Sequence, residues 1–157
     1  MSFWKKALVC ILAVEILGNA SGLITFFSIK DWYASLARPP GTPPNGAFGP
    51  VWTLLYAMIG YALALIWHSD TDLTKKKPAF QWFAIQMAFN LAWTPAFFGL
   101  HRIDLALIVI LFLMSSIAVT IAKFALISRL AAGLLVPYLL WVAYATYLNA
   151  GFWWLNR

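Results

Sequence analysis

Charged side chains are scarce in this sequence: they make up 10% of the 157 residues, and only 5 residues are Asp or Glu. Soluble domains carry about 25% charged residues and roughly 45–50% apolar ones. Hydrophobic residues here reach 63%, so the composition excludes a water-soluble globule. Aromatic residues account for 17% of the chain, which also excludes a disordered linker.

Residues that carry common chemistry are also few. The single cysteine, Cys10, excludes an intramolecular disulfide, and no Cys or His pairs have metal-ligand spacing, so we predict no metal site. No Ser-His-Asp pattern, carboxylate pair or glycine-rich phosphate loop is present, which argues against hydrolysis and phosphoryl transfer. His68 and His101 lie at the ends of apolar runs; haem ligation is one hypothesis for them, and an interfacial position is the commoner one.

Long apolar runs predict an all-α integral membrane protein with five transmembrane helices, each of about 20 residues. The predicted spans are residues 7–27, 48–67, 80–99, 105–126 and 130–155. The first run is longer than the apolar region of a signal peptide and lacks a small-residue cleavage site, so we expect it to be retained. Residues 1–157 therefore form one membrane domain, with no room for a soluble one.

Lys and Arg are divided unequally between the two ends of these helices. Lys5, Lys6, Lys75, Lys76, Lys77, Lys123 and Arg129 fall on one side, and Lys30, Arg38, Arg102 and Arg157 on the other. The positive-inside rule then places the N-terminus in the cytoplasm and the first loop and C-terminus outside. This orientation explains the net charge of +6 better than nucleic-acid binding does.

The first loop, residues 28–47, is the longest connection, and its four prolines disfavour a helix. We predict a lid over the bundle, because long loops in compact domains are usually functional or disordered; an extended linker is the alternative. The predicted lid residues are Trp32, Tyr33, Leu36, Arg38, Pro39, Pro43 and Pro44.

Small residues in the predicted helices indicate where they pack closely in lipid. Ala84, Ala88, Ala92 and Ala96 form a stripe with four-residue spacing, and Gly18 and Gly22 repeat that spacing in the first helix. The alanine stripe is the candidate interface of a homodimer. Packing within one bundle explains the same pattern equally well.

Polar residues at membrane depth are costly and therefore informative. Three predicted helices carry polar or aromatic faces that we expect to converge: Glu15, Asn19 and Gly22; Gln86, Asn90 and Trp93; and Tyr138, Trp141, Ala145 and Asn149. One interpretation is a polar-aromatic cavity. The other is a set of interhelical hydrogen bonds that only fix the packing. This second interpretation applies especially to Asn90 and Asn149, because their amides can satisfy backbone groups that are freed near Pro95 and Pro137.

The nine tryptophans divide by position into two groups. Trp4, Trp32, Trp67, Trp82, Trp153 and Trp154 lie near predicted helix ends, where interfacial anchoring explains them. Trp52, Trp93 and Trp141 lie deeper, and with Tyr56 and Phe97 they could stack against a flat ligand. Aromatic core packing is the alternative explanation.

Several motifs, taken in order, resemble the translocator protein family, also called tryptophan-rich sensory proteins. They are Trp32-Tyr33, Leu36, Arg38-Pro39, Pro43-Pro44, Phe48, Pro50-Val51-Trp52 and Leu55-Tyr56; then Gln86, Asn90, Trp93, Pro95 and Phe97-Phe98-Gly99; then Pro137-Tyr138-Leu139, Trp141, Ala145-Thr146 and Leu148-Asn149. The resemblance covers nearly the whole chain. It implies a five-helix bundle, commonly a homodimer, with a pocket beneath the first loop.

The resemblance also implies a function: a membrane receptor or sensor for porphyrins such as protoporphyrin IX or haem-type tetrapyrroles, with no obligatory cofactor. The implied ligand-binding residues, together with the neighbouring aromatic residues, are Gly22, Trp52, Tyr56, Asn90, Trp93, Phe97, Tyr138, Trp141, Ala145, Leu148 and Asn149. The first alternative is light- and oxygen-dependent degradation of porphyrin, in which Trp52 and Trp141 would be catalytic. The second is transport of tetrapyrroles or other small molecules, although no inverted repeat supports it.

One departure from the family concerns the cholesterol-recognition segment of its mitochondrial members. The matching tyrosine position is Ala150 here, and no basic residue follows Tyr147 until Arg157. This favours a bacterial member without a dedicated sterol role. An all-helical bundle with its basic residues mainly on the cytoplasmic side favours the bacterial inner membrane over the outer one. The expected partners are a hydrophobic small molecule, the lipid bilayer and a second copy of the chain, with no nucleic acid.

Overall fold

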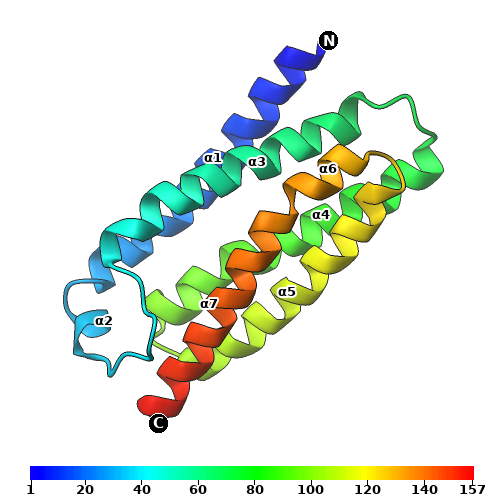
Figure 1. The fold of residues 1–157 in the computed structure, drawn as a ribbon. Helices are drawn as coiled ribbons and strands as arrows, with labels where there is room; N and C mark the ends of the chain where they lie inside the picture. The colour runs from blue at the N-terminus through cyan, green and yellow to red at the C-terminus, as the bar shows by residue number, and fades with distance from the viewer.

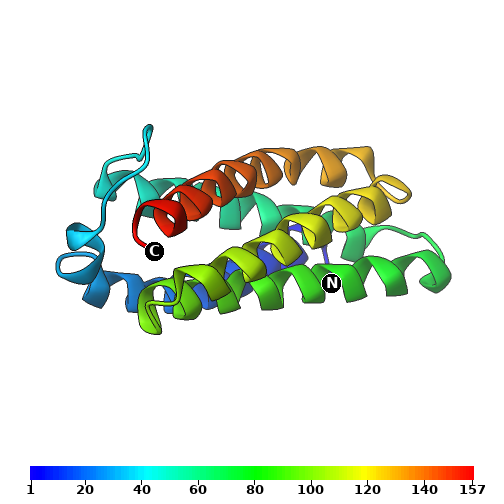
Figure 2. The ribbon, with the colours of Figure 1, turned by 90° about the horizontal axis from the view of Figure 1, so that it is seen from below.

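The computed structural model describes residues 1–157 and contains helices only (Figure 1). The elements are α1 (Phe3–Ser28), α2 (Trp32–Ser35), η1 (Asn45–Ala47), α3 (Phe48–His68), α4 (Leu73–Thr94), η2 (Pro95–Gly99), α5 (Ile103–Ala125), α6 (Arg129–Leu134) and α7 (Val136–Leu155). The long helices run along one common direction, and the chain from α2 to η1 crosses the end of the bundle where the C-terminus lies (Figure 2).

Four segments are long and apolar enough to cross a membrane: α1, η1 with α3, α5, and α6 with α7. The prediction of apolar spans is confirmed for these four. The predicted third span, residues 80–99, corresponds to α4 and η2, which do not reach the same hydropathy. The structure thus confirms an all-α protein with several candidate spans, and it leaves the fifth span as a prediction.

The predicted start of the third helix, at residue 80, is wrong, because α4 begins at Leu73. Three lysines and Pro78 gave that stretch the composition of a loop. In the structure, the Lys76 ammonium donates to the carbonyl oxygens of Trp67, in the last turn of α3, and of Ser69, the residue after its end. A cation that binds the carbonyl end of a helix stabilises that end, so Lys76 joins the first turn of α4 to the end of α3.

Two prolines, Pro95 and Pro137, lie where regular α-helical winding is interrupted. At Pro95 the α-helix gives way to a wider π-helical turn, in which the Leu100 N–H donates to the Pro95 carbonyl oxygen at 2.8 Å. Pro137 has no N–H to donate, and the predicted span 130–155 is accordingly divided at Leu135 into α6 and α7. The prediction of no helix in the first loop needs correction at α2 and at the short turn η1, while residues 37–44 are non-helical.

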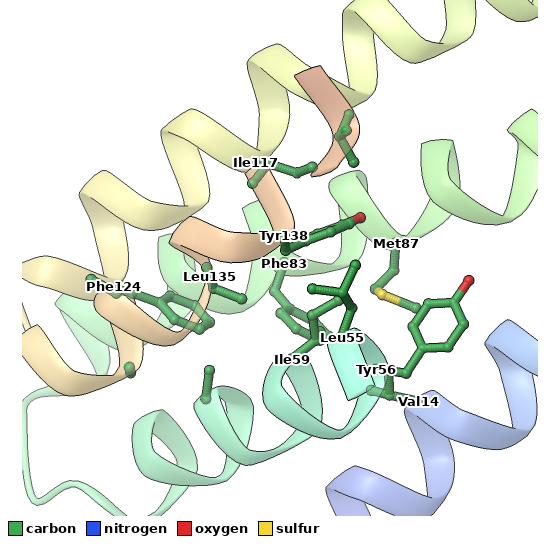
Figure 3. Close-up of a cluster of buried hydrophobic side chains, with 14 of the residues drawn as sticks. Val14, Leu55, Tyr56, Ile59, Phe83, Met87, Ile117, Phe124, Leu135 and Tyr138 are labelled. Carbon is green, nitrogen blue, oxygen red and sulfur yellow. The ribbon is translucent and has the colours of Figure 1, made fainter. Parts of the chain in front are cut away.

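The largest hydrophobic cluster lies where α3, α4, α5 and α7 meet, and Ile59, Phe124, Tyr138 and Leu135 are among its buried members (Figure 3). Helix α1 packs closely against α3 because glycines remove the side chains between them. A Cβ atom on Gly60 would lie 2.5 Å from Ile11 Cα, far inside contact distance. This tight pairing fixes α1 as one wall of the bundle.

The basic residues separate to the two ends of the bundle as the sequence predicts. The end formed by the N-terminus, the α3–α4 loop and the α5–α6 loop carries the larger set, and the end with the first loop carries the smaller set (Figure 1). Which end faces the cytoplasm stays a prediction.

The alanine stripe on α4 is only partly on the surface. Ala84, Ala88 and Ala92 are exposed, whereas Ala96 is buried with a relative exposure of 4%. Ala96 belongs to the π-helical turn, whose wider winding breaks the four-residue register of the stripe. The surface stripe is therefore limited to three alanines.

Candidate functional site

A cavity of about 390 Å³ lies inside the bundle, beneath the first loop. Its lining residues are Gly18, Asn19, Gly22, Leu23, Thr25, Tyr33, Phe48, Gly49, Trp52, Tyr56, Asn90, Trp93, Thr94, Phe97, Phe98, Ile110, Leu113, Trp141, Val142, Ala145, Leu148, Asn149 and Phe152. This volume falls in the range of about 300–1,000 Å³ that small-molecule sites occupy. Every ligand-binding residue predicted from the sequence lines the cavity except Tyr138.

The three deep tryptophans reach the cavity from three different helices: Trp52 from α3, Trp93 from α4 and Trp141 from α7. Trp52 stacks on Tyr56 with 5.2 Å between ring centroids, and Trp93 stacks on Phe97 at the same distance. Stacked pairs hold the indole planes in place. The cavity walls are thus flat, rigid aromatic surfaces.

Trp141 also separates the cavity from the outside of the bundle. The indole lines a second, open groove of about 430 Å³ between α3 and α7, together with Val51, Leu55, Pro137, Leu140 and Tyr144. Trp141 lines the inner cavity as well. One aromatic side chain is therefore a partition between the cavity and the outer surface of two candidate membrane spans.

The tryptophans near the helix ends are mostly on the surface. Trp4, Trp67, Trp153 and Trp154 are exposed, and Trp82 is half-buried, which agrees with their position at predicted interfaces. Trp32 differs, because its indole stacks on the His101 ring at 4.2 Å and packs on Phe97 at 5.5 Å. The structure places Trp32 in the loop packing.

The two asparagines that the sequence pointed to are both buried, with different hydrogen-bond partners. Asn149 Oδ1 accepts from the Trp93 indole N–H at 2.9 Å, and its Nδ2 donates to the Ile103 carbonyl oxygen at 2.9 Å. Both ends of this amide are thereby satisfied inside the protein. Asn149 consequently fixes the Trp93 indole and joins α7 to α4 and α5.

Asn90 takes part in a chain of hydrogen bonds that begins at the cavity. The Tyr56 hydroxyl donates to Asn90 Oδ1 at 3.1 Å, and Asn90 Nδ2 donates to the Tyr138 hydroxyl oxygen at 2.8 Å. The Tyr138 hydroxyl donates in turn to Gln86 Oε1 at 2.8 Å. Figure 3 shows both tyrosine hydroxyls on the same side of the core cluster. Tyr138 thus lies behind the cavity wall, where it holds Asn90.

The polar face of α1 joins the cavity only in part. Asn19 lines the cavity, and its Nδ2 donates to Glu15 Oε2 at 2.8 Å. Glu15 itself is half-buried and lies outside the lining. The expected convergence of three faces on the cavity therefore leaves Glu15, Gln86 and Tyr138 outside the lining and holds for Asn19, Gly22, Asn90, Trp93, Trp141, Ala145 and Asn149.

The first loop is fastened to α7 by side chains of that helix and of Asn156, the residue that follows its end. Asn156 Oδ1 accepts from the Ala37 N–H at 2.9 Å, and Asn156 Nδ2 donates to the Ala37 carbonyl oxygen at 3.0 Å. The Tyr147 hydroxyl donates to the Pro40 carbonyl oxygen at 2.9 Å. The Tyr144 hydroxyl donates to the carbonyl oxygen of Gly41. These bonds place residues 37–41 against the C-terminal half of α7.

Side chains of the loop also close over the cavity. Tyr33 is buried, lines the cavity and packs on Phe98 and Phe152. Burial raises the pKa of the Tyr33 hydroxyl, while the Arg38 guanidinium, 5.3 Å above its ring, lowers it in part. The loop therefore lies against the cavity through Tyr33, and its role as a lid stays a prediction.

The remaining predicted lid residues differ in their packing. Leu36 packs against the apolar cluster beneath the loop, and Pro39 is buried. A Cβ on Gly151 would lie 2.6 Å from Pro39 Cβ, so only glycine lets the loop approach α7 this closely. Pro43 is half-buried and Pro44 is exposed, so the second proline pair contributes to the turn before α3.

Sequence reasoning missed several apolar lining residues. Ile110 and Leu113 extend from α5, whose serines and threonine, Ser115, Ser116 and Thr120, lie outside the cavity lining, so no polar or tryptophan side chain marks the cavity-facing part of this helix. Gly18 lines the cavity, where a Cβ would meet the Tyr56 ring at 2.2 Å, and its four-residue spacing to Gly22 predicts only close helix packing. Phe152 lies one turn beyond Leu148, and helical spacing could have identified it.

The two histidines lie at opposite ends of the bundle. His68 packs on Phe3 at one end of the bundle, and His101 lies beneath Trp32 at the other. Neither lines the cavity. The structure contains no group of three His, Cys, Asp or Glu side chains that could hold a metal ion.

Comparison with known proteins identifies one family over most of the chain. The sequence profile of the TspO/MBR family matches residues 9–155. The tryptophan-rich protein TspO of Chlorobaculum tepidum is 37% identical over 140 residues, 89% of each chain, and that of Archaeoglobus fulgidus is 37% identical over 151 residues, 96% of this chain and 97% of the relative. The translocator protein of Homo sapiens is 39% identical over 123 residues, 78% of this chain and 73% of the relative. With these matches and its apolar helices, the chain belongs to the TspO/MBR family of multi-pass membrane proteins.

Proposed function

We propose that this protein is a membrane receptor that binds porphyrins and similar flat hydrophobic molecules in the cavity beneath the first loop. The observation that carries the proposal is the set of three indoles, Trp52, Trp93 and Trp141, around one cavity of about 390 Å³. Flat aromatic walls stack well on a planar ring system. Few polar side chains line the same cavity, which is typical of sites that bind apolar ligands and orient them by a few hydrogen bonds.

Titration with protoporphyrin IX tests the proposal through quenching of tryptophan fluorescence. We expect saturable quenching for the wild type and an affinity at least tenfold lower for the double variant Trp52→Phe/Trp141→Ala. The matched control is Trp154→Phe, because Trp154 is exposed at the end of α7; its affinity should equal that of the wild type. An unchanged affinity in the double variant would remove the proposed site.

A second candidate function is oxidation of the bound porphyrin in light, with molecular oxygen as the oxidant. The observation that favours it is that Trp52 and Trp141 line the same cavity and that Trp52 stacks directly on Tyr56. Illumination in air should then bleach porphyrin faster with the wild type than with detergent alone, and Trp52→Phe should slow the bleaching. Equal bleaching in all three samples would leave binding as the only function.

We further propose that α4 is the fifth transmembrane helix of the bundle. It runs beside α5 along its length (Figure 2), and its polar residues Gln86 and Asn90 are buried inside the protein. Lys75 at its start and Arg102 after its end should then lie on opposite sides of the membrane. Cysteines introduced at these positions in a Cys10→Ala background should react with an impermeant maleimide from opposite sides. Reaction from the same side would exclude a fifth span.

The same experiment determines the orientation, for which we propose a cytoplasmic N-terminus in a bacterial inner membrane.

We also propose that two copies associate through the exposed alanines Ala84, Ala88 and Ala92, since small residues allow close helix approach in lipid. Ala88→Trp should convert a dimer to a monomer in light-scattering measurements in detergent. A dimer that persists would place the interface elsewhere.

A further inference from the structure

Gln86 has an unsatisfied donor in the interior of the protein. Its side chain is buried, with a relative exposure of 1%, and its Nε2 atom has no hydrogen-bond partner. Its Oε1 atom accepts from Tyr138 at 2.8 Å. An unsatisfied buried amide N–H is rare and calls for an explanation.

The unsatisfied atom is the inner end of the hydrogen-bond chain described above. In the observed direction each group donates inward, from Tyr56 to Asn90, to Tyr138 and to Gln86. The hydroxyl hydrogen of Tyr56 is thus used for Asn90, and only the lone pairs of its oxygen are left for a ligand in the cavity. Tyr56 then presents an acceptor to the cavity.

The same four groups allow the opposite direction. The oxygen and NH₂ of an amide have nearly the same size, so a half-turn of the Gln86 and Asn90 amides exchanges donor and acceptor without moving the backbone. Gln86 Nε2 then donates to Tyr138, Tyr138 to Asn90 Oδ1, and Asn90 Nδ2 to the Tyr56 oxygen. The Tyr56 hydroxyl hydrogen is released into the cavity, and Tyr56 presents a donor.

We propose that this chain reverses, and that Gln86 thereby determines whether the cavity prefers a ligand with a hydrogen-bond acceptor or a donor at Tyr56. Gln86 does not line the cavity, so it acts as a positioning residue, through Tyr138 and Asn90. In the wild type each direction leaves one atom of Gln86 without a hydrogen-bond partner. That atom is the Nε2 donor when Tyr56 donates to Asn90, and the Oε1 acceptor when Asn90 donates to Tyr56. The bound ligand decides between them, and the cavity accepts both kinds of ligand.

Removing the inner end of the chain should fix its direction. In Gln86→Leu, Tyr138 loses the acceptor for its hydroxyl hydrogen, and Asn90 Oδ1 is the acceptor that remains in the chain. Asn90 then donates to Tyr56, and the Tyr56 hydroxyl points into the cavity as a donor. Ligands that accept a hydrogen bond keep their affinity, and ligands that only donate lose theirs.

Three flat probes of nearly equal size measure this preference: 9-fluorenone, which only accepts; carbazole, whose N–H donates; and fluorene, which does neither. We expect the ratio of the carbazole Kd to the fluorenone Kd to rise about tenfold in Gln86→Leu, the effect of one hydrogen bond. Gln86→Met, which keeps the length of the side chain, should give the same change. Gln81→Leu is the matched control, since Gln81 is exposed on the same helix, and its ratio should not change.

The effect must pass through Tyr138, which gives a second test. In a Tyr138→Phe background the chain is already broken, so Gln86→Leu should leave the ratio unchanged. A ratio that stays constant in Gln86→Leu and Gln86→Met, or that changes equally in the Tyr138→Phe background, overturns the inference. The inference rests on the proposed ligand site, and failure of fluorene itself to bind would refute that site instead.

Discussion

The fastening of the first loop by Asn156 leads to a prediction whose size follows from the structure. Asn156→Ala removes two hydrogen bonds to Ala37, one to its N–H and one to its carbonyl oxygen. Each bond contributes about 0.5–1.5 kcal/mol net, so the closed loop should lose about 1–3 kcal/mol. Because the site is exposed to solvent, we expect the lower half of this range, which corresponds to about tenfold more frequent opening.

Hydrogen–deuterium exchange measures this opening directly and needs no ligand. The Ala37 N–H has the Asn156 side chain as its acceptor, so its exchange should accelerate about tenfold in Asn156→Ala, and that of the Thr42 N–H should follow if the loop opens as a unit. Asn45→Ala is the matched control, because Asn45 is exposed in the same loop. Exchange of residues 36–44 at the wild-type rate in Asn156→Ala would refute the fastening.

Three further predictions concern stability. Gly60→Ala should lower the unfolding temperature in detergent by forcing α3 away from α1, whereas Gly133→Ala, where a Cβ meets nothing within 4 Å, should leave it unchanged or raise it; equal effects would contradict the tight α1–α3 contact. His101 has a φ of 55°, so His101→Gly should be about 1 kcal/mol more stable than His101→Ala although both lose the stack on Trp32. Since burial raises the pKa of Tyr33, its neutral form favours the closed loop; closure should persist below the pKa of a free tyrosine, about 10, and weaken as pH rises through the raised value. Exchange measurements at alkaline pH should show this weakening in the wild type and not in Tyr33→Phe.

The apolar helices could be predicted from the sequence because a membrane span is defined by a local property, the length of an apolar run. The start of α4 could not, because Lys76 is accommodated there by the carbonyl oxygens of Trp67 and Ser69, which belong to the end of another helix. The π-helical turn at Pro95 could not be predicted from the sequence either. A proline indicates that a helix is disturbed, but it does not determine whether the helix bends, widens or ends there.

The cavity residues could be predicted where polarity or aromatic size marks them, as for Asn90, Trp52 and Trp141. Ile110 and Leu113 could not, because an apolar residue that faces a cavity and one that faces lipid look alike in a sequence. Tyr138 is the opposite case, a residue that the sequence predicts to line the cavity and that does not line it. It shares a helical face with Trp141, yet it is fully buried behind the cavity, and only three-dimensional packing separates a lining residue from a supporting one.

The partners of Asn90 and Asn149 show that the two sequence-based interpretations of polar residues are not exclusive. Asn149 is satisfied at both ends by Trp93 and Ile103, as expected for a packing role, and it lines the cavity as well. Asn90 belongs to a chain with an unsatisfied end. The hydrogen bonds that join the helices are thus also the polar part of the candidate site.

The most direct test of the account is an experimental structure of the protein with protoporphyrin IX bound. The account predicts ring density inside the cavity, against Trp52, Trp93 and Trp141 and beneath residues 36–44 of the closed loop. Porphyrin bound only on the outside of the bundle, with the cavity between these three indoles empty, would contradict it.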